Sequence, residues 1–133
     1  MQKTIDFIKT NYFIFILFFV IGFSLYANSF VVPFFWDDND NVVNNVYVKT
    51  WQYLPKYFSE NLIAGAGLMS NYWRPLLLLN YSLDYHFFDL NKYWWHFEDI
   101  LLHIFNAFVI FSLLFHLINK MRLAFGVGVI FLF

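Results

Sequence analysis

Two adjacent carboxylates, Asp37 and Asp38, follow directly after the first long apolar segment of the chain. A carboxylate can take a proton from an attacking group when it lies within hydrogen-bond reach. The same residues could instead mark a solvated helix terminus, where acids are common. The pair by itself leaves both interpretations open, so the elements around it must decide.

A second polar set is formed by His96, Asp99, His103 and Asn106, which are spaced three, four and three residues apart. This spacing puts all four on one face of a helix. Polar groups are costly in lipid, so such a face must point into a protein interior or a watery cavity. For His103 or Asn106 taken singly, ordinary interhelical hydrogen bonding is an alternative. The four together predict a hydrated pocket that opens on the side of the aspartate pair.

Both polar sets were tested as metal sites. Asp37, Asn39 and Asn41 imitate the start of a calcium loop, but Val42 and Val48 stand where glycine and glutamate are required. The calcium-loop interpretation therefore fails. The imidazoles and carboxylate of the second set suit zinc, yet their spacing fits several other uses equally well. We predict no metal ligands, and a divalent cation stays open as a cofactor.

Composition indicates a membrane protein, because apolar and aromatic residues make up 61% of the chain and charged residues only 13%, against roughly 25% in soluble domains. Residues 12–32 form an uncharged run of 21 residues, long enough to cross the roughly 30 Å hydrocarbon layer. Residues 100–119 form a second such run. Residues 123–133 are apolar but too short to span. We therefore expect an all-α, multi-pass protein of which this chain is an N-terminal fragment, with two full spans and a truncated third.

The basic residues predict the orientation. Lys3 and Lys9 precede the first span, and Lys120 and Arg122 follow the second, which fits the positive-inside rule. The loop 33–99, with eight of the nine acids, is then expected outside the cytoplasm. The near-neutral net charge of -1 gives no reason to expect a nucleic-acid partner, and the absence of cysteine excludes disulfides and thiolate metal sites.

The outer loop is expected to contain short interfacial helices. The aromatic residues of segment 51–60 recur at near-helical spacing, which predicts an amphipathic helix with its rings at headgroup level. Segment 61–70, which contains two glycines, is typical of a mobile connection. Pro75 suits the first turn of a helix of about 13 residues, too short to span. Trp94 and Trp95 are interpreted as interfacial anchors rather than as sugar platforms.

The order of these segments resembles the N-terminal part of the GT-C membrane glycosyltransferases. It looks closest to the branch of transmembrane O-mannosyltransferases that act on cadherins and their bacterial relatives, over about residues 12–118. The resemblance is carried, in chain order, by Phe35-Trp36-Asp37-Asp38, Asn44-Asn45, Tyr72-Trp73-Arg74-Pro75-Leu76, Asp84, and His96 through His103. Asp99 departs from the family pattern His-x-x-Asn-x-x-x-His.

The resemblance implies one glycosyltransferase-like domain over residues 1–133, in a bacterial inner membrane or the endoplasmic reticulum membrane. Such enzymes transfer a sugar, with inversion, from a polyprenyl phosphate carrier to a protein or glycan hydroxyl. Asp37 would be the general base and Asp38 would orient or share the site. Arg74 would hold the leaving phosphate, or alternatively pair with an aspartate. His96, His103 and Asn106 would contact substrate.

Two other classes remain open from the sequence. A transporter or proton relay also places Asp, His and Asn on an inner helix face, although usually near mid-membrane. A membrane anchor or assembly subunit would need neither the Arg-Pro-Leu segment nor the polar helix face. The fragment alone is expected to be inactive, because the donor pocket would need helices that it lacks.

Overall fold

The computed structural model describes residues 2–133, and side chains from residue 12 onward. The side chains of Lys3 and Lys9, which helped to predict the orientation, lie outside the described residues. Residues 2–133 are helical with no strand, as predicted. They form two compact units, one made of residues up to 30 and from 96 to 133, the other of residues 31–95. We call them the long-helix unit and the loop unit.

Two helices are long and apolar enough to cross a membrane. Helix α1 (Gln2–Tyr26) continues as a 3-10 helix, Ala27–Val31, and its candidate span is Tyr12–Val31. Helix α5 (Lys92–Ile118) is the second. It begins eight residues before the uncharged run that predicted it, because charged residues near a helix end do not interrupt the helix. Helix α6 (Met121–Leu132) has only 12 residues.

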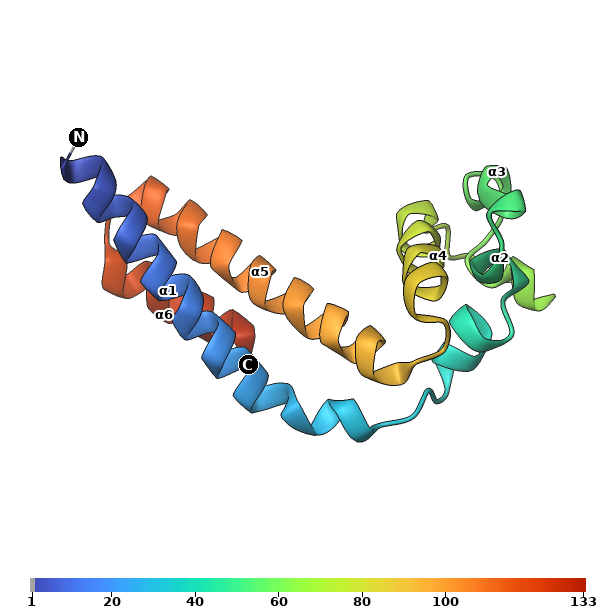
Figure 1. Ribbon diagram of the computed structural model, residues 1–133. Helices are drawn as coiled ribbons and strands as arrows, with labels where there is room; N and C mark the ends of the chain where they lie inside the picture. The colour runs from blue at the N-terminus through green and yellow to red at the C-terminus, as the bar shows by residue number, and fades with distance from the viewer. Residues whose placement is uncertain (1) are drawn as a thin grey trace. The chain divides into compact units, whose positions relative to one another are not determined.

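The long-helix unit is held together by small and aromatic residues. A Cβ added to Gly22 would lie 2.4 Å from Ile104 of α5, and one added to Gly128 of α6 would lie 2.7 Å from Phe18 of α1. Absent side chains thus let the backbones approach closely, as in membrane helix pairs. Phe18 is fully buried. Figure 1 shows α1, α5 and α6 side by side.

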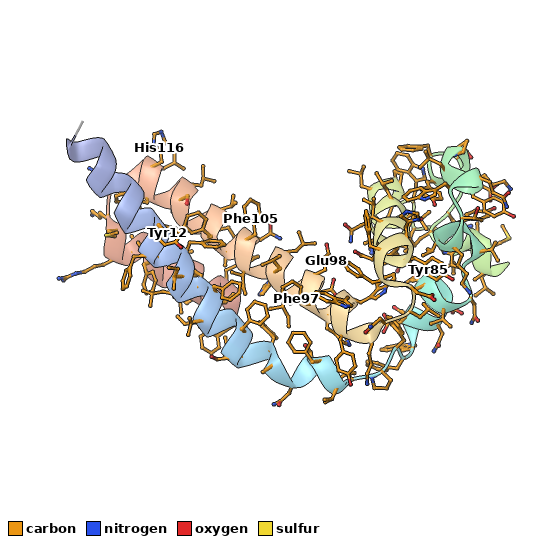
Figure 2. All side chains as sticks on the ribbon, viewed as in Figure 1. Tyr12, Tyr85, Phe97, Glu98, Phe105 and His116 are labelled. Atoms are coloured by element: carbon orange, nitrogen blue, oxygen red, sulfur yellow. The ribbon has the colours of Figure 1, made fainter. Side chains whose placement is uncertain are left out.

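The outer faces of these helices are apolar and uncovered. In the most apolar stretch of each candidate span only 17% (α1) and 22% (α5) of the residues are buried. Phe105, for example, points away from the three helices in Figure 2 and is half exposed. A core helix of a soluble protein would instead bury most of its apolar residues.

The loop unit consists of short helical segments packed on one longer helix. Helix α4 (Pro75–Phe88) begins with proline at its first turn, as predicted. Helix α2 (Val46–Lys49) and helix α3 (Leu54–Tyr57) pack against it. The connecting turns are a π-helix, Asn39–Val43, and two 3-10 helices, Trp51–Tyr53 and Ala64–Ala66.

Polar groups are buried inside the loop unit and are hydrogen-bonded. The Asn45 side chain accepts from the Tyr47 amide at 3.1 Å, and its amide group donates to the Leu62 carbonyl at 2.9 Å. The Tyr57 hydroxyl donates to the Tyr47 carbonyl at 2.7 Å and contacts the Ser82 hydroxyl. These contacts tie α2, α3 and α4 together, because a buried polar group that lost its partner would be costly.

Three sequence expectations for this unit need correction. Segment 51–60 is a 3-10 turn and a single α turn, and Tyr57 is fully buried rather than placed at headgroup level. Segment 61–70 is packed rather than a loose connection, since Leu62 is buried and its amide donates to the Tyr72 carbonyl. Trp95 is a core residue whose indole N–H donates to the Asp89 carbonyl at 2.8 Å. In each case a hydrogen-bond partner distant in sequence outweighs the local pattern.

Candidate functional site

Asp37 and Arg74 line the same cavity in the loop unit, although they are far apart in the sequence. The cavity has a volume of about 240 Å³. Its remaining walls are Asp40, Asn41, Leu62, Ile63, Ser70 and Tyr72. The structure therefore brings together the predicted base and the predicted phosphate-binding residue, and we call this the Asp37–Arg74 cavity.

The backbone before Asp37 turns sharply. Trp36 has a φ of 51°, a left-handed conformation that is unusual for a bulky residue. Such backbone strain costs roughly 1–3 kcal/mol and is concentrated at functional sites. The π-helix Asn39–Val43 follows at once, and π-turns are also frequent at such sites. The irregular backbone turns the Asp37 side chain into the cavity wall.

Asp38 has a different position from its neighbour. Its carboxylate accepts a hydrogen bond from the Phe35 amide at 3.1 Å, and it does not line the Asp37–Arg74 cavity. This bond closes the turn that contains Trp36. In the structure, then, Asp38 supports the turn that precedes Asp37.

Arg74 lies at the N-terminal end of α4, directly before Pro75. Its guanidinium carbon is 5.0 Å from the centre of the Tyr72 ring, so a cation–π contact orients the side chain. Within the described part of the chain, Arg74 forms no ion pair with Asp37 or Asp38. The salt bridge that the sequence left open as an alternative is therefore not formed. The positive guanidinium lies next to the N-terminal end of α4, where the helix dipole is also positive.

Asp40 is a cavity residue that the sequence analysis missed. It lies three residues after Asp37 and lines the same cavity. In a helical turn, residues three apart share a face, so this spacing could have identified it. Two carboxylates and one guanidinium therefore border the cavity. Carboxylates can accept a proton and a guanidinium can bind an anion, so the cavity wall contains both types of group.

The polar face of α5 is only partly assembled into a pocket. His96, Asp99 and His103 line a cavity of about 310 Å³ in the long-helix unit, together with Tyr26, Ser29 and Ile100. Asn106 does not line it and is exposed. The expected row of four thus becomes a group of three, because the last member lies beyond the end of the cavity.

Two of the cavity residues bind the last turn of α6. The Tyr26 hydroxyl donates to the Leu132 carbonyl at 2.8 Å, and the His103 ring nitrogen lies 3.4 Å from the same oxygen. His103 therefore has a contact between helices α5 and α6, and its predicted contact with substrate stays a prediction.

Among the residues that the structure describes, no three His, Cys, Asp or Glu side chains gather closely enough to hold a metal ion. The zinc site considered for His96, Asp99 and His103 is therefore not formed, even though the three share a cavity. Their ring and carboxylate groups are spread along two turns of α5 instead of converging on a point.

A charged cluster lies elsewhere in the loop unit. Lys56 pairs with Glu60 at 3.2 Å, and the Tyr47 hydroxyl bonds to both. The pKa of Glu60 is held below its usual value, mainly by the hydrogen bond from Tyr47 and to a smaller extent by the one from Lys56. The pKa of Lys56 is raised, mainly by its hydrogen bond to Tyr47 and to a smaller extent by the one to Glu60. The pKa of Tyr47 is raised mainly by its bond to Glu60.

Comparisons with protein-family models, curated proteins and solved structures found no match to this chain. The functional argument therefore rests on the geometry of the cavities and on their chemistry.

Proposed function

We propose that the protein is a membrane glycosyltransferase of the GT-C type, which transfers a sugar from a polyprenyl phosphate to an acceptor hydroxyl. The observation that carries this proposal is the placement of Asp37 and Arg74 in one cavity. A base and an anion-binding group are the two functions that such a transfer needs.

In this reaction the acceptor oxygen attacks the anomeric carbon and its proton passes to the Asp37 carboxylate. The bond between the anomeric carbon and the phosphate oxygen breaks, and the phosphate leaves with the bonding electrons. Arg74 and the first turn of α4 stabilise that developing charge. Attack from the face opposite the phosphate inverts the anomeric configuration.

The uncovered apolar helices support a membrane location. The spans of α1 and α5 would leave most of their apolar residues in water if the protein were soluble. A lipid-linked donor has its tail in the bilayer and its sugar in water. An enzyme that uses it needs both membrane helices and a polar unit, and this chain has both.

The test compares Asp37→Asn with Asp38→Asn in the complete protein of which this chain is expected to be a fragment, inserted in membranes. Polyprenyl-phosphate mannose is the donor, and transfer of radiolabelled mannose is the measurement. Asparagine cannot take the proton, so Asp37→Asn should lower turnover about 10²-fold or more. An asparagine side chain can still accept from the Phe35 amide, so Asp38→Asn should change turnover far less. Near-normal turnover by Asp37→Asn would refute the proposal.

Donor binding is measured with the same variants. Arg74→Ala should weaken it by a contact worth about 1.5 to 3 kcal/mol, whereas Asp37→Asn should leave it nearly unchanged. Arg74→Lys keeps the charge but loses the bidentate geometry, so its donor affinity should lie between that of Arg74→Ala and that of Asp37→Asn. Equal donor affinity in all of these proteins would remove Arg74 from the site.

A further inference from the structure

A second cavity of the loop unit, with a volume of about 560 Å³, has no role in the proposed transfer. It lies within the range of roughly 300–1,000 Å³ typical of ligand pockets. Its walls come from the segment that joins α2 to α3, from the C-terminal half of α4 and from the start of α5, all within residues 48–94. It shares no wall residue with the Asp37–Arg74 cavity.

Aromatic rings form part of its wall. Trp51 and Trp94 are 39% and 47% exposed, so each presents ring surface. The rings are also held in place. Trp94 stacks on Phe88 with ring centres 5.1 Å apart and planes 14° from parallel, and the Trp51 indole N–H lies 3.4 Å from the His86 ring nitrogen. The cavity thus offers positioned, flat apolar faces.

Hydrogen-bonding groups of both kinds complete the wall. Thr50 can donate and accept, Asn91 has both an amide donor and a carbonyl, and Asp89 is an acceptor. Lys49 and Asp89 are of opposite charge, so the cavity has no excess of either sign from these two groups. These two opposite charges give no reason to prefer an anion over a neutral ligand in this cavity.

Asp89 is fixed in an uncommon conformation. Its φ is 52°. Its backbone amide donates to the Tyr85 carbonyl at 2.8 Å, and its backbone carbonyl accepts from the Trp95 indole N–H, also at 2.8 Å. One carboxylate oxygen accepts from the Leu90 amide at 2.8 Å. Burial, and then the charge of Asp89 and a hydrogen bond to it, raise the pKa of Tyr85. Strain of this kind is typical of ligand-binding positions.

We propose that this cavity binds a neutral saccharide. A sugar ring has a face of C–H groups, which packs on an aromatic ring, and an edge of hydroxyls that each donate and accept. The Trp51 and Trp94 rings match the first feature, and the mixed donors and acceptors match the second. An apolar ligand would leave the polar groups unpaired, and an anion would meet the Asp89 carboxylate.

The proposed sugar site lies far from the proposed catalytic cavity. Arg74 precedes the first residue of α4, whereas the wall residue of the sugar site nearest to it along the helix is Ser82, about 12 Å further on at 1.5 Å per residue. The site therefore binds a saccharide away from the reacting atoms. It stands on its own observations and does not depend on the transferase proposal, because binding can be measured without any transfer.

The experiment measures binding of free mannotriose, cellotriose and chitotriose by saturation-transfer NMR. The full chain is placed in lipid nanodiscs, which avoid detergents with sugar headgroups. Trp94→Ala removes a ring of the cavity, and Thr50→Val removes a hydroxyl without changing the shape of the side chain. The control is Tyr93→Ala, which removes the exposed neighbouring ring that does not line the cavity.

We expect at least one trisaccharide to bind, with affinity lowered about tenfold by Trp94→Ala, less by Thr50→Val, and unchanged by Tyr93→Ala. Trp94→Phe should restore part of the affinity, which separates a lost ring from a misfolded unit. Nanodiscs that contain a glucosyl diacylglycerol identify the source of the sugar. If this glycolipid competes with the free trisaccharide, the natural ligand is a lipid headgroup. If it does not compete, the natural ligand is a free glycan.

Three results would overturn the proposal. One is no binding of any trisaccharide at about 10 mM by a folded chain, a concentration at which even millimolar sites fill. Another is equal loss of binding in Trp94→Ala and Tyr93→Ala. The third is displacement of the bound trisaccharide by inorganic phosphate at equal concentration.

Discussion

The long-helix unit and the loop unit use polar residues in opposite ways. In the former, Tyr26 and His103 both contact the Leu132 carbonyl of α6, and the buried core is apolar. In the latter, Asn45, Ser82 and Asp84 are buried among hydrophobic residues. The polar groups of the long helices hold helices together, whereas those of the loop unit shape a surface with cavities.

The difference follows from backbone regularity. A continuous helix satisfies its own amides and carbonyls except at its ends, so its polar side chains are needed mainly there. Short turns leave many backbone groups without partners, and buried side chains must bond to them. The same irregular turns project Asp37 and Asp89 into cavities. Chemistry in this molecule is therefore expected in the loop unit.

The largest expected effect tests whether close packing in the loop unit depends on its polar core. A Cβ at Gly65 would lie 1.9 Å from the Asn45 side-chain oxygen and 2.8 Å from the Tyr47 amide. Because two hydrogen bonds hold Asn45, it cannot simply move aside. Gly65→Ala should lower the free energy of unfolding by about 2 to 3 kcal/mol, measured by denaturant titration.

The matched control for this substitution is Gly126→Ala in α6, where an added Cβ meets nothing within 4 Å. Because alanine favours helix over glycine, this variant should be neutral or more stable by up to about 1 kcal/mol. Similar losses in the two variants would contradict the argument that the Asn45 network is what makes the loop unit intolerant.

The sequence predicted regular elements better than irregular ones. The uncharged runs identified α1 and α5, and Pro75 identified the start of α4, because these signals are local. The burial of Tyr57 and Trp95 could not be predicted, since it depends on carbonyls of Tyr47 and Asp89 reached only after folding.

The candidate site shows the same limit. The adjacent carboxylates singled out Asp37 and the family resemblance added Arg74, and both residues line one cavity in the structure. Periodicity correctly put His96 and Asn106 on one helix, but it could not show where the cavity ends. The proposed saccharide site was not predicted, and Trp94 was interpreted as an interfacial anchor, because the cavity walls come from three separate segments, none of which has a motif.

A smaller effect tests whether the polar face of α5 is structural. Tyr26→Phe removes a 2.8 Å bond to the Leu132 carbonyl and should cost about 0.5 to 1 kcal/mol of unfolding free energy. His103→Phe should cost less, because its contact is 3.4 Å long. The double variant should cost more than the sum, since the carbonyl then loses both donors.

Unfolding of the single and double variants in nanodiscs, with mannose transfer measured in parallel, decides the point. If His103→Phe abolished transfer while unfolding like the parent protein, His103 would contact substrate as the family resemblance implied. The contrast between the two units would then fail at this residue.

The smallest effect concerns pH and the charged cluster of Tyr47, Lys56 and Glu60. The pKa of Glu60 is below its ordinary value of 4.5 in the folded protein, so its stabilisation is present above that pH and is lost as the pH falls below it. The pKa of Lys56 is above its ordinary 10.5, so its contribution is complete below that pH and is lost as the pH rises further.

The contributions of the three residues are compared by measuring the unfolding free energy of variants as a function of pH, between about pH 5 and pH 3. Glu60→Gln should abolish this part of the slope. Tyr47→Phe keeps the ring but removes the strongest bond to Glu60, so it should remove more of the slope than Lys56→Met. The reverse order would make the exposed Lys56–Glu60 pair the main contributor, contrary to the small worth of surface ion pairs. It would also mean that the loop unit draws this stability from surface charge rather than from hydrogen bonds to its partly buried hydroxyl.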